Sequence, residues 1–353
     1  MGVQTGRIPD RTDREHPDAM QPVLAGNLNG SNVSLVSPIQ GLVAKIRAGR
    51  LRALARAISI VEDHGTDSIE LLKALFPYSG NAALIGVTGS PGAGKSTLVD
   101  QIAREYRKQG KTIGIIAVDP TSPFSGGAIL GDRIRMQSHY ADPGIYIRSM
   151  ATRGSLGGLA STTADVATVI DASGRDLVMI ETVGVGQDEV DIVSLADVTV
   201  VVLVPGMGDD VQTIKAGIME IADVFVINKA DRDGAERVER EIRAMQSLSI
   251  RSDNWTPSIV KTVASEGSGI ADAVAAIEQY REYLAKGDAG EHRRVANWRK
   301  RITEMLRDAL FHRVMTDYLG NGEAERLAAE VAEHKRDPYS LVEEIVGELG
   351  KHQ

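Results

Sequence analysis

The sequence contains no cysteine, and this absence excludes two kinds of chemistry. Disulfide bonds and thiolate metal sites both need cysteine sulfur, so neither can be part of this protein. The 7 histidines are scattered along the chain, which also argues against a histidine-rich metal store.

Long apolar runs and an excess of basic residues are missing as well. No apolar run approaches the ~20 residues of a membrane-spanning helix, and the N-terminus lacks the apolar core of a secretory signal. The formal net charge is −8, whereas nucleic-acid binding usually needs a basic face. We therefore expect a cytoplasmic protein that binds neither nucleic acid nor a membrane.

What is present is ordinary for a globular enzyme. Apolar residues make up 42% and charged residues 25% of the chain, as in soluble globular proteins generally. A chain of 353 residues can bury a full core, and its length favours about two domains or one domain with appendages.

One short stretch follows an apolar run at 83–87 and opens a helical pattern. A strand, the pattern G-x-x-x-x-G-K-[ST] and a helix in this order are typical of a phosphate-binding P-loop. Its glycines let backbone N–H groups turn toward phosphate oxygens, and the helix N-terminus adds partial positive charge. We expect Lys95 to reach the β- and γ-phosphates and the Ser96 hydroxyl to bind Mg²⁺. The predicted phosphate-binding residues are Gly89, Ser90, Pro91, Gly92, Ala93, Gly94, Lys95, Ser96 and Thr97.

Two other interpretations of this stretch compete with the P-loop. A glycine-rich turn between a strand and a helix can be purely structural, and a dinucleotide-binding fingerprint has a similar spacing. The fingerprint needs a third glycine near Thr97, where the sequence has none. A nucleotide-phosphate site is favoured over both.

Strands and helices alternate between residues 81 and 285, which predicts an α/β fold of the P-loop NTPase class. Such a fold has a mostly parallel sheet flanked by helices and binds ligands at the carboxyl ends of its strands. Residues 1–36 are polar and aperiodic and predict a disordered tail, while residues 37–80 predict an N-terminal helical region. The expected strands are 84–88, 112–118, 145–148, 177–180, 198–204, 224–227 and 258–263, and the expected helices between them are 97–109, 159–171, 212–220, 235–247 and 270–284.

Residues 286–353 predict a C-terminal arm of two helices. Apolar residues from Val295 to Val314 line one face of the first helix, and Asp337-Pro338 begins the second. Two helices have little core of their own. We therefore expect the C-terminal arm to cover the nucleotide domain or a second subunit.

The strongest companion of the P-loop is Asn228-Lys229-Ala230-Asp231, directly after an apolar run. An N-K-x-D sequence at a strand end in a P-loop protein reads guanine. The Asp231 carboxylate would accept hydrogen bonds from the ring N–H and the 2-amino group, which adenine lacks, so GTP is favoured over ATP. Asn228 would bond the carbonyl edge of the base, the Lys229 stem would lie along its plane, and the loop at Ala264 would form its backbone wall. Alone, the tetrapeptide could be a helix N-cap.

Glu181-Thr182-Val183-Gly184 follows another predicted strand, where a GTPase has its D-x-x-G sequence. A glutamate can hold a Mg²⁺-bound water as an aspartate does, and Gly184 offers a backbone N–H to the γ-phosphate. A plain strand-end turn is the alternative. Val185 stands where Ras-like enzymes carry a water-orienting glutamine, so we expect slow intrinsic hydrolysis.

Two aspartates between the strands complete the predicted catalytic set with Lys95 and Glu181. Asp119 ends a strand before a loop rich in Pro, Ser and Gly, and Asp132 lies at the far end of that loop. Either could hold Mg²⁺ or orient the attacking water, so we expect Ser96, Asp119, Asp132 and Glu181 around the metal. Asp119 could instead form a turn before Pro120, and Asp132 could cap a helix. The loop at 206–215 is either a third mobile element or a plain connection.

Five stretches together resemble the MeaB/ArgK family of P-loop GTPases. They are GVTGSPGAGKST, VDPTSPFSGGAILGDRIRM, MATRGSLGGL, ETVGVGQ and NKAD, and the resemblance runs from about Leu42 to Gln353. It implies a homodimeric GTP-hydrolysing chaperone that assists adenosylcobalamin-dependent methylmalonyl-CoA mutase by gating cofactor loading and protecting the enzyme. It also places catalytic or Mg²⁺ roles on Asp119, Asp132 and Glu181. Pro123-Phe124 departs from the family's Ser/Thr-Arg pattern, so no basic side chain is expected there.

Two other functions compete with the mutase chaperone. A kinase acting on a transport-system binding protein is associated with the ArgK name, but the guanine-reading sequence argues against an ATP-using kinase. A metal-insertion GTPase shares the broad class, yet the absence of cysteine and of a histidine cluster removes its expected metal site.

Overall fold

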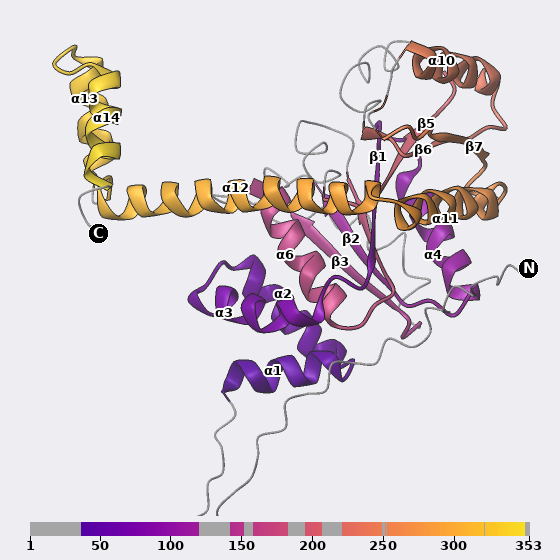
Figure 1. The fold of residues 1–353 in the computed structure, drawn as a ribbon, viewed down its shortest axis with the longest axis horizontal. Coiled ribbons are helices and arrows are strands. Elements are labelled where there is room, and N and C mark those ends of the chain that lie inside the picture. The colour runs from indigo at the N-terminus through magenta and orange to yellow at the C-terminus, as the bar shows by residue number, and fades with distance from the viewer. Residues whose placement is uncertain are drawn as a thin grey trace, which may run out of the picture. The chain divides into compact units, whose positions relative to one another are not determined.

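A parallel β-sheet lies at the centre of the fold (Figure 1). The computed structural model describes residues 37–119, 142–151, 158–182, 195–206, 221–248, 251, 253–320 and 322–349, so the predicted tail at 1–36 lies outside it. Within these ranges the sheet has 7 strands in the order β3-β2-β4-β1-β5-β6-β7, and all its pairs are parallel. The strands are β1 (Ala83–Gly89), β2 (Ile113–Asp119), β3 (Ile145–Ala151), β4 (Leu177–Glu181), β5 (Val198–Leu203), β6 (Val224–Asn228) and β7 (Ser258–Thr262).

Continuous apolar runs made these strands predictable. Every residue of β4, β5 and β6 is buried, as expected for parallel strands that are covered on both faces. Each predicted strand starts within one residue of an observed strand, and β3 extends to Ala151, beyond the predicted end at Arg148. The predicted fold class is confirmed.

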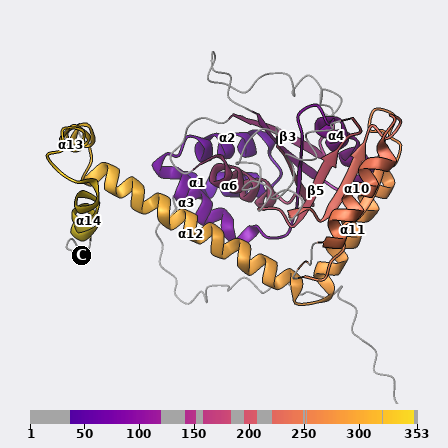
Figure 2. The same cartoon turned by 90° about the horizontal axis from the view of Figure 1, so that it is seen from above.

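Helices cover both faces of the sheet (Figure 2). The side chains of Val200 and Val202 share a core with α4 (Lys95–Lys108) and α11 (Ile270–Lys286). On the opposite face, α6 (Gly158–Ala172) packs on β2 and β4, whereas α10 (Ala235–Leu248) packs on β5 and β6. The predicted helix at 212–220 lies outside the described residues.

An N-terminal group of helices packs against α6 and extends its side of the core. The predicted start at Ser37-Pro38 is observed: the backbone N–H of Gln40 donates to Ser37 Oγ at 3.3 Å, with proline in the first turn. Such a cap satisfies one of the free N–H groups of the first turn. The members of the group are α1 (Pro38–Arg47), α2 (Leu51–Glu62), α3 (Thr66–Leu75) and the 3₁₀ turn η1 (Phe76–Tyr78).

The long helix α12 (Ala289–Asp317) is fixed to the body near its N-terminal end. Arg293 Nη2 lies 2.8 Å from Oδ2 of the fully buried Asp223, which directly precedes β6. Two turns later, Arg301 Nη2 pairs with Asp165 Oδ1 of α6 at 2.6 Å. A helix end held by two ion pairs to different elements has a defined direction relative to the sheet.

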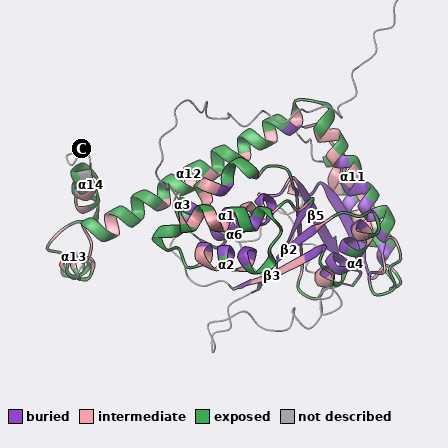
Figure 3. Cartoon of the chain, turned by 90° about the horizontal axis from the view of Figure 1, so that it is seen from below, coloured by how far each residue is buried: buried purple, intermediate pink, exposed green. Residues whose placement is uncertain are grey.

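The C-terminal arm contains three described helices rather than the two predicted. After α12 come α13 (Glu323–Ala332) and α14 (Pro338–Leu349). The prediction missed α13, a helix of 10 residues on which only Leu327 is buried. Beyond Arg301, α12 is largely exposed (Figure 3), including Ile302, Leu306 and Phe311. Among the helices in the described ranges, none is both long and apolar enough to cross a membrane.

Candidate nucleotide-binding site

The loop between β1 and α4 has a backbone that only glycine permits at two positions. Gly89 has φ +141°, and a Cβ there would lie 2.1 Å from the Val202 carbonyl oxygen. Gly94 caps α4 with φ +87°, where a Cβ would lie 2.5 Å from Asn228 Nδ2. Both positions combine a left-handed conformation with close approach of a neighbour, which excludes a side chain. The glycines of the motif therefore shape the loop before α4.

Lys95 places its ammonium group over this loop. Its side chain is only 5% exposed, and Nζ donates to the carbonyl oxygens of Gly89 at 2.6 Å and Ser90 at 3.0 Å. These two carbonyls hold a positive charge beside the N-terminus of α4, where an anion is also favoured by the helix dipole. The arrangement suits a phosphate chain.

Ser96 and Glu181 meet at the carboxyl ends of two adjacent strands. Strands β1 and β4 pair with Val87 opposite Glu181, and Ser96 Oγ donates to Glu181 Oε1 at 2.5 Å. Hydroxyl and carboxylate oxygens are the ligands that Mg²⁺ takes in nucleotide enzymes. The donor set of these two residues fits that ion.

Asn228 joins the P-loop to the loop after β7. Its Nδ2 donates to the Ala93 carbonyl at 2.8 Å, while its Oδ1 accepts from the Ala264 N–H and the Thr262 hydroxyl, each at 3.1 Å. Lys229, at φ +56°, donates from Nζ to the Gly92 carbonyl at 2.7 Å. Backbone strain of this kind at a non-glycine residue often marks a functional turn.

Three of the predicted base-contacting residues, Asn228, Lys229 and Ala264, are thus linked to the P-loop directly or through Asn228. Asn228 and Ala264 are buried, whereas Asp231 is exposed two residues beyond Lys229. The exposed Asp231 carboxylate is free to contact the edge of a base. The buried Asn228 amide holds the P-loop and the loop at Ala264 together. The side chain that we expect to select guanine is therefore accessible.

Part of the predicted metal and catalytic set lies outside the described residues. Asp132 and the side chain of Asp119 belong to this group, and the predicted nucleotide-binding residue Gly184 and its neighbour Val185 lie outside the described residues as well. The backbone of Asp119 ends β2, two residues past Ala117, which stands opposite Glu181. Within the described ranges, no three His, Asp or Glu side chains gather as metal ligands. The roles of Asp119 and Asp132 stay predictions.

Sequence reasoning missed a pair of threonines beside the P-loop. Thr182 Oγ1 donates to Thr88 Oγ1 at 3.0 Å, and both side chains are buried. The pair links the residue before Gly89 to the residue after Glu181. The sequence does contain a signal for this pair, because each threonine stands at the end of an otherwise apolar strand.

The comparisons identify the family to which this site belongs. The family model described as "Methylmalonyl Co-A mutase-associated GTPase MeaB" matches residues 54–318. The chain belongs to the MeaB family. This confirms the resemblance inferred from the five sequence stretches.

Relatives of this MeaB-family chain come from archaea, bacteria and animals. A Pyrococcus abyssi protein provisionally named a GTPase is 47% identical, covering 88% of this chain and 97% of its own. The GTPase ArgK of Escherichia coli is 38% identical over 69% of this chain and 76% of its own. The mouse protein named methylmalonic aciduria type A homolog, mitochondrial, is 36% identical over 69% of this chain and 64% of its own.

The fold of this MeaB-family chain also matches a solved structure. A crystal structure titled as the LAO/AO transport system kinase has a TM-score of 0.65 and 25% identity, and covers 88% of this chain and 97% of its own. Family, relatives and fold agree that the chain is a P-loop GTPase, a hydrolase. The prediction of a GTP-hydrolysing enzyme is confirmed.

Proposed function

We propose that this GTPase is a chaperone for an adenosylcobalamin-dependent methylmalonyl-CoA mutase, which it serves by gating cofactor loading and protecting the enzyme from inactivation. The observation that carries the proposal is the family match over residues 54–318, because the family description names association with that mutase. The name of the mouse relative, which refers to methylmalonic aciduria, supports the same client.

Guanine nucleotides are the ligands that the site residues favour. The exposed Asp231 carboxylate can accept hydrogen bonds, and the N–H edge of guanine supplies two donors. Asn228 holds the P-loop through its hydrogen bond to Ala93. A movement of Asn228 would therefore change the contacts to the base and the contacts to the phosphates together. We infer that GTP and GDP bind across the residues 89–97, 228–231 and 264.

Mg²⁺ is the metal that we expect with GTP, held by Ser96 and Glu181 with help from Asp119 or Asp132. Such an ion neutralises charge that develops on the phosphates during transfer. Lys95 stabilises the same oxygens, and the β1–α4 loop orients them through its backbone N–H groups. Glu181→Gln should raise the Mg²⁺ concentration needed for half-maximal hydrolysis by about tenfold, because hard cations prefer charged oxygen ligands. GDP affinity measured in EDTA should not change, and an unaltered Mg²⁺ requirement would remove Glu181 from the metal site.

We further propose a homodimer formed through the C-terminal arm. The apolar side chains of Ile302, Leu306, Leu310 and Phe311 are exposed along α12, and those of Val342 and Val346 on α14. Exposed apolar surface on this scale favours a protein partner. A second copy of the chain is the partner that the family resemblance implies.

The client can be tested by co-purification. Tagged protein would be mixed with purified methylmalonyl-CoA mutase in the presence of GDP, a non-hydrolysable GTP analogue or no nucleotide. We expect capture that depends on the nucleotide, together with faster GTP hydrolysis in the complex. A Lys95→Ala variant controls for nucleotide binding. Absence of capture and of stimulation under all three conditions would contradict the chaperone role while leaving the GTPase activity in place.

A second candidate function is suggested by the matching structure titled as a transport system kinase. Such a kinase would transfer the γ-phosphoryl group to a protein rather than to water. The two functions differ in products, because a chaperone GTPase releases inorganic phosphate. Radiolabelled GTP and ATP, each with a periplasmic-type binding protein as acceptor, would separate them: label on the acceptor would favour the kinase.

A further inference from the structure

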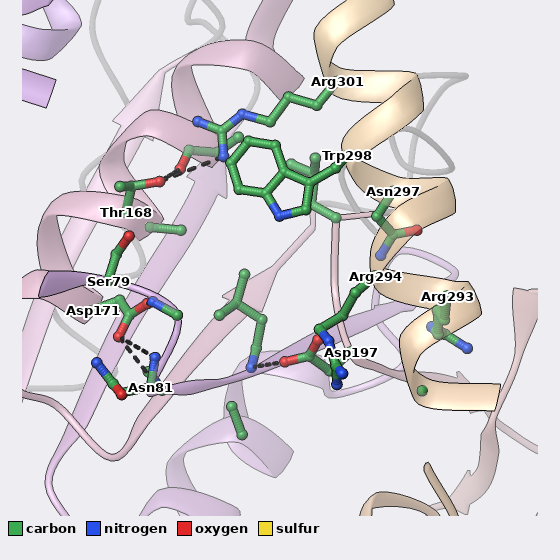
Figure 4. A pocket seen from close by; sticks show the side chains of 18 of the residues that line it. Ser79, Asn81, Thr168, Asp171, Asp197, Arg293, Arg294, Asn297, Trp298 and Arg301 are labelled. Carbon is green, nitrogen blue, oxygen red and sulfur yellow. Dashed lines mark hydrogen bonds between the residues drawn. The ribbon is translucent and has the colours of Figure 1, made fainter. Parts of the chain in front are cut away.

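A pocket of about 640 Å³ lies at the edge of the sheet opposite the P-loop (Figure 4). It is bounded by Leu84 at the start of β1, Asp197 just before β5, helix α6 and the first turns of α12. Its volume falls within the roughly 300–1,000 Å³ of small-molecule sites. From Leu84 at the pocket, strand β1 runs about 16 Å to Gly89 at the rise of a parallel strand. The pocket is therefore distinct from the nucleotide site.

One side of the pocket is apolar and aromatic. Ala164 and Ala167 of α6 are buried along it, and Phe76 meets Trp298 edge-to-face with ring centroids 5.5 Å apart. These two rings remain 53% and 40% exposed, although they are large apolar groups beside a cavity. Such a surface gains free energy when a flat apolar body covers it.

Four arginines line the pocket, and three of them are already committed to carboxylates. Each of these three makes an ion pair of 2.8 Å or shorter. The pairs are Arg281 with Glu278, Arg293 with Asp223, and Arg301 with Asp165. They hold the walls of the pocket together rather than offering charge to a ligand.

Arg294 is the exception. Within the described ranges it makes no ion pair or hydrogen bond, and Figure 4 shows it reaching from α12 toward Asp197. Asn297, three residues later on the same helix, likewise has no hydrogen-bond partner among the described residues. Residues three apart lie on one helix face. A guanidinium and an amide therefore stand together at the pocket without hydrogen bonds to the described part of the protein, although the charge of Arg294 still acts on the nearby Asp197 carboxyl and lowers its pKa against the effect of burial.

Two carboxylates line the pocket, those of Asp171 and Asp197. They repel a bound anion less strongly than two free carboxylates would. Asp171 accepts hydrogen bonds from the backbone N–H groups of Gly80, Asn81 and Ala82. Asp197 accepts from the Leu84 N–H at 2.9 Å, and burial raises the pKa of its carboxyl group, which disfavours the charged form. Each carboxylate is thus held by backbone groups at the wall.

We propose that this pocket binds a small amphipathic anion: an apolar, preferably aromatic body against Trp298 and the α6 alanines, and an oxyanion on Arg294. The planar guanidinium fork matches a carboxylate, phosphate or sulfonate group with two parallel hydrogen bonds. Asn297 supplies a further donor. The proposal does not depend on the identity of the client protein, because it rests on the pocket alone.

The test uses 1-anilinonaphthalene-8-sulfonate as the anionic probe and N-phenyl-1-naphthylamine as its uncharged counterpart. The sequence has 2 tryptophans, and Trp255 packs elsewhere, against Tyr280 and Tyr283. In the full-length Trp255→Phe protein, emission therefore reports on Trp298 alone. Energy transfer from Trp298 to the probe would locate binding, and titration calorimetry on the protein with both tryptophans gives the same affinities if Trp255→Phe fails to fold.

Arg294→Gln is the decisive variant, and Arg299→Gln is its matched control, because Arg299 is exposed on α12 and does not line the pocket. We expect Arg294→Gln to weaken binding of the anionic probe by about tenfold, as for the loss of a charge-assisted hydrogen bond. Arg299→Gln should change it by less than about twofold, and the uncharged probe should bind all three proteins equally.

Three outcomes would overturn the proposal. The anionic probe could bind the Arg294→Gln and Arg299→Gln variants with equal affinity, or it could bind without energy transfer from Trp298, which would place it elsewhere. Alternatively, Trp298 emission could shift with protein concentration while no probe binds. That result would show that a second copy of the chain fills the pocket.

Discussion

The side-chain amide of Asn228 donates a 2.8 Å hydrogen bond to the carbonyl oxygen of Ala93 inside the P-loop. The oxygen of the same amide accepts from the Ala264 N–H at 3.1 Å. One buried side chain therefore connects the loop that cradles phosphate with the loop that we expect to face the base. A substitution of Asn228 should therefore weaken the contacts to the phosphates and the contacts to the base.

Asn228→Ala should weaken binding of both GTP and GDP by about 10- to 100-fold. Removing the amide leaves the Ala93 carbonyl and the Ala264 N–H without their partner, and each unsatisfied buried group costs about 1–3 kcal/mol. Fluorescent-nucleotide titration measures the effect, with circular dichroism to confirm folding. Equal affinities in the variant and the parent would mean that the two loops are held by other contacts.

Asp231→Asn should change which nucleotide binds. The carboxylate only accepts hydrogen bonds, whereas an amide can also donate. Guanine presents donors at this edge and xanthine presents a carbonyl, so the variant should lose affinity for GTP and gain affinity for xanthosine triphosphate. Because Asp231 is exposed and bears no structural hydrogen bond in the described part of the chain, folding should not suffer. Competition between the two nucleotides gives the answer, and unchanged GTP affinity would exclude Asp231 as the guanine reader.

The elements that sequence predicted well are those whose residues carry their own signal. Buried parallel strands are continuous apolar runs, so Leu177–Glu181 and Val224–Asn228 were located to within a residue at each end. The P-loop and the N-K-x-D sequence are recognised because phosphate binding and base binding require particular residue types at fixed spacings. Both types of signal are local along the chain.

The features that sequence could not predict depend on distant partners. Asp223 and Arg293 are 70 residues apart and form a buried ion pair that fixes α12. Nothing near either residue indicates the other. The pocket with Arg294 is likewise built from four separate parts of the chain, and Thr88 finds Thr182 only because β1 and β4 are neighbours in the sheet.

The ion pair at Arg293 also decides how the C-terminal arm should be tested. Removing the chain from Glu291 onward would delete Arg293 and leave one fewer partner for the buried Asp223, which is strongly destabilising in itself. Residues 1–304 keep the anchors Arg293 and Arg301 and lose the exposed apolar positions from Met305 onward. We expect this shortened protein to be a monomer that binds GDP as the full chain does.

Light scattering at micromolar concentration measures the mass of both proteins. The full-length double variant Leu306→Glu, Leu310→Glu provides a second route, because charges on the apolar face of α12 oppose burial of that face. It should also be monomeric. A full-length protein that is already a monomer, or a shortened protein that still dimerises, would contradict a dimer formed through the C-terminal arm.

The last prediction is that hydrolysis is slow until the client binds. In the described part of the site, the groups gathered at the P-loop are an ammonium, a hydroxyl and a carboxylate, from Lys95, Ser96 and Glu181. We expect them to stabilise charge, and the sequence has Val185 where a glutamine would orient the attacking water. A missing water-orienting or arginine group can leave about 10³–10⁵ of rate unrealised.

A client that completes the site should therefore raise kcat much more than it changes nucleotide affinity. Asp119→Ala should lower both basal and stimulated hydrolysis, since a carboxylate is needed in either state, while Val185→Gln should raise the basal rate alone. Single-turnover hydrolysis with and without methylmalonyl-CoA mutase separates these cases. Rapid basal turnover that the mutase leaves unchanged would place the water-orienting group within this chain, and the client would then act on something other than the chemical step.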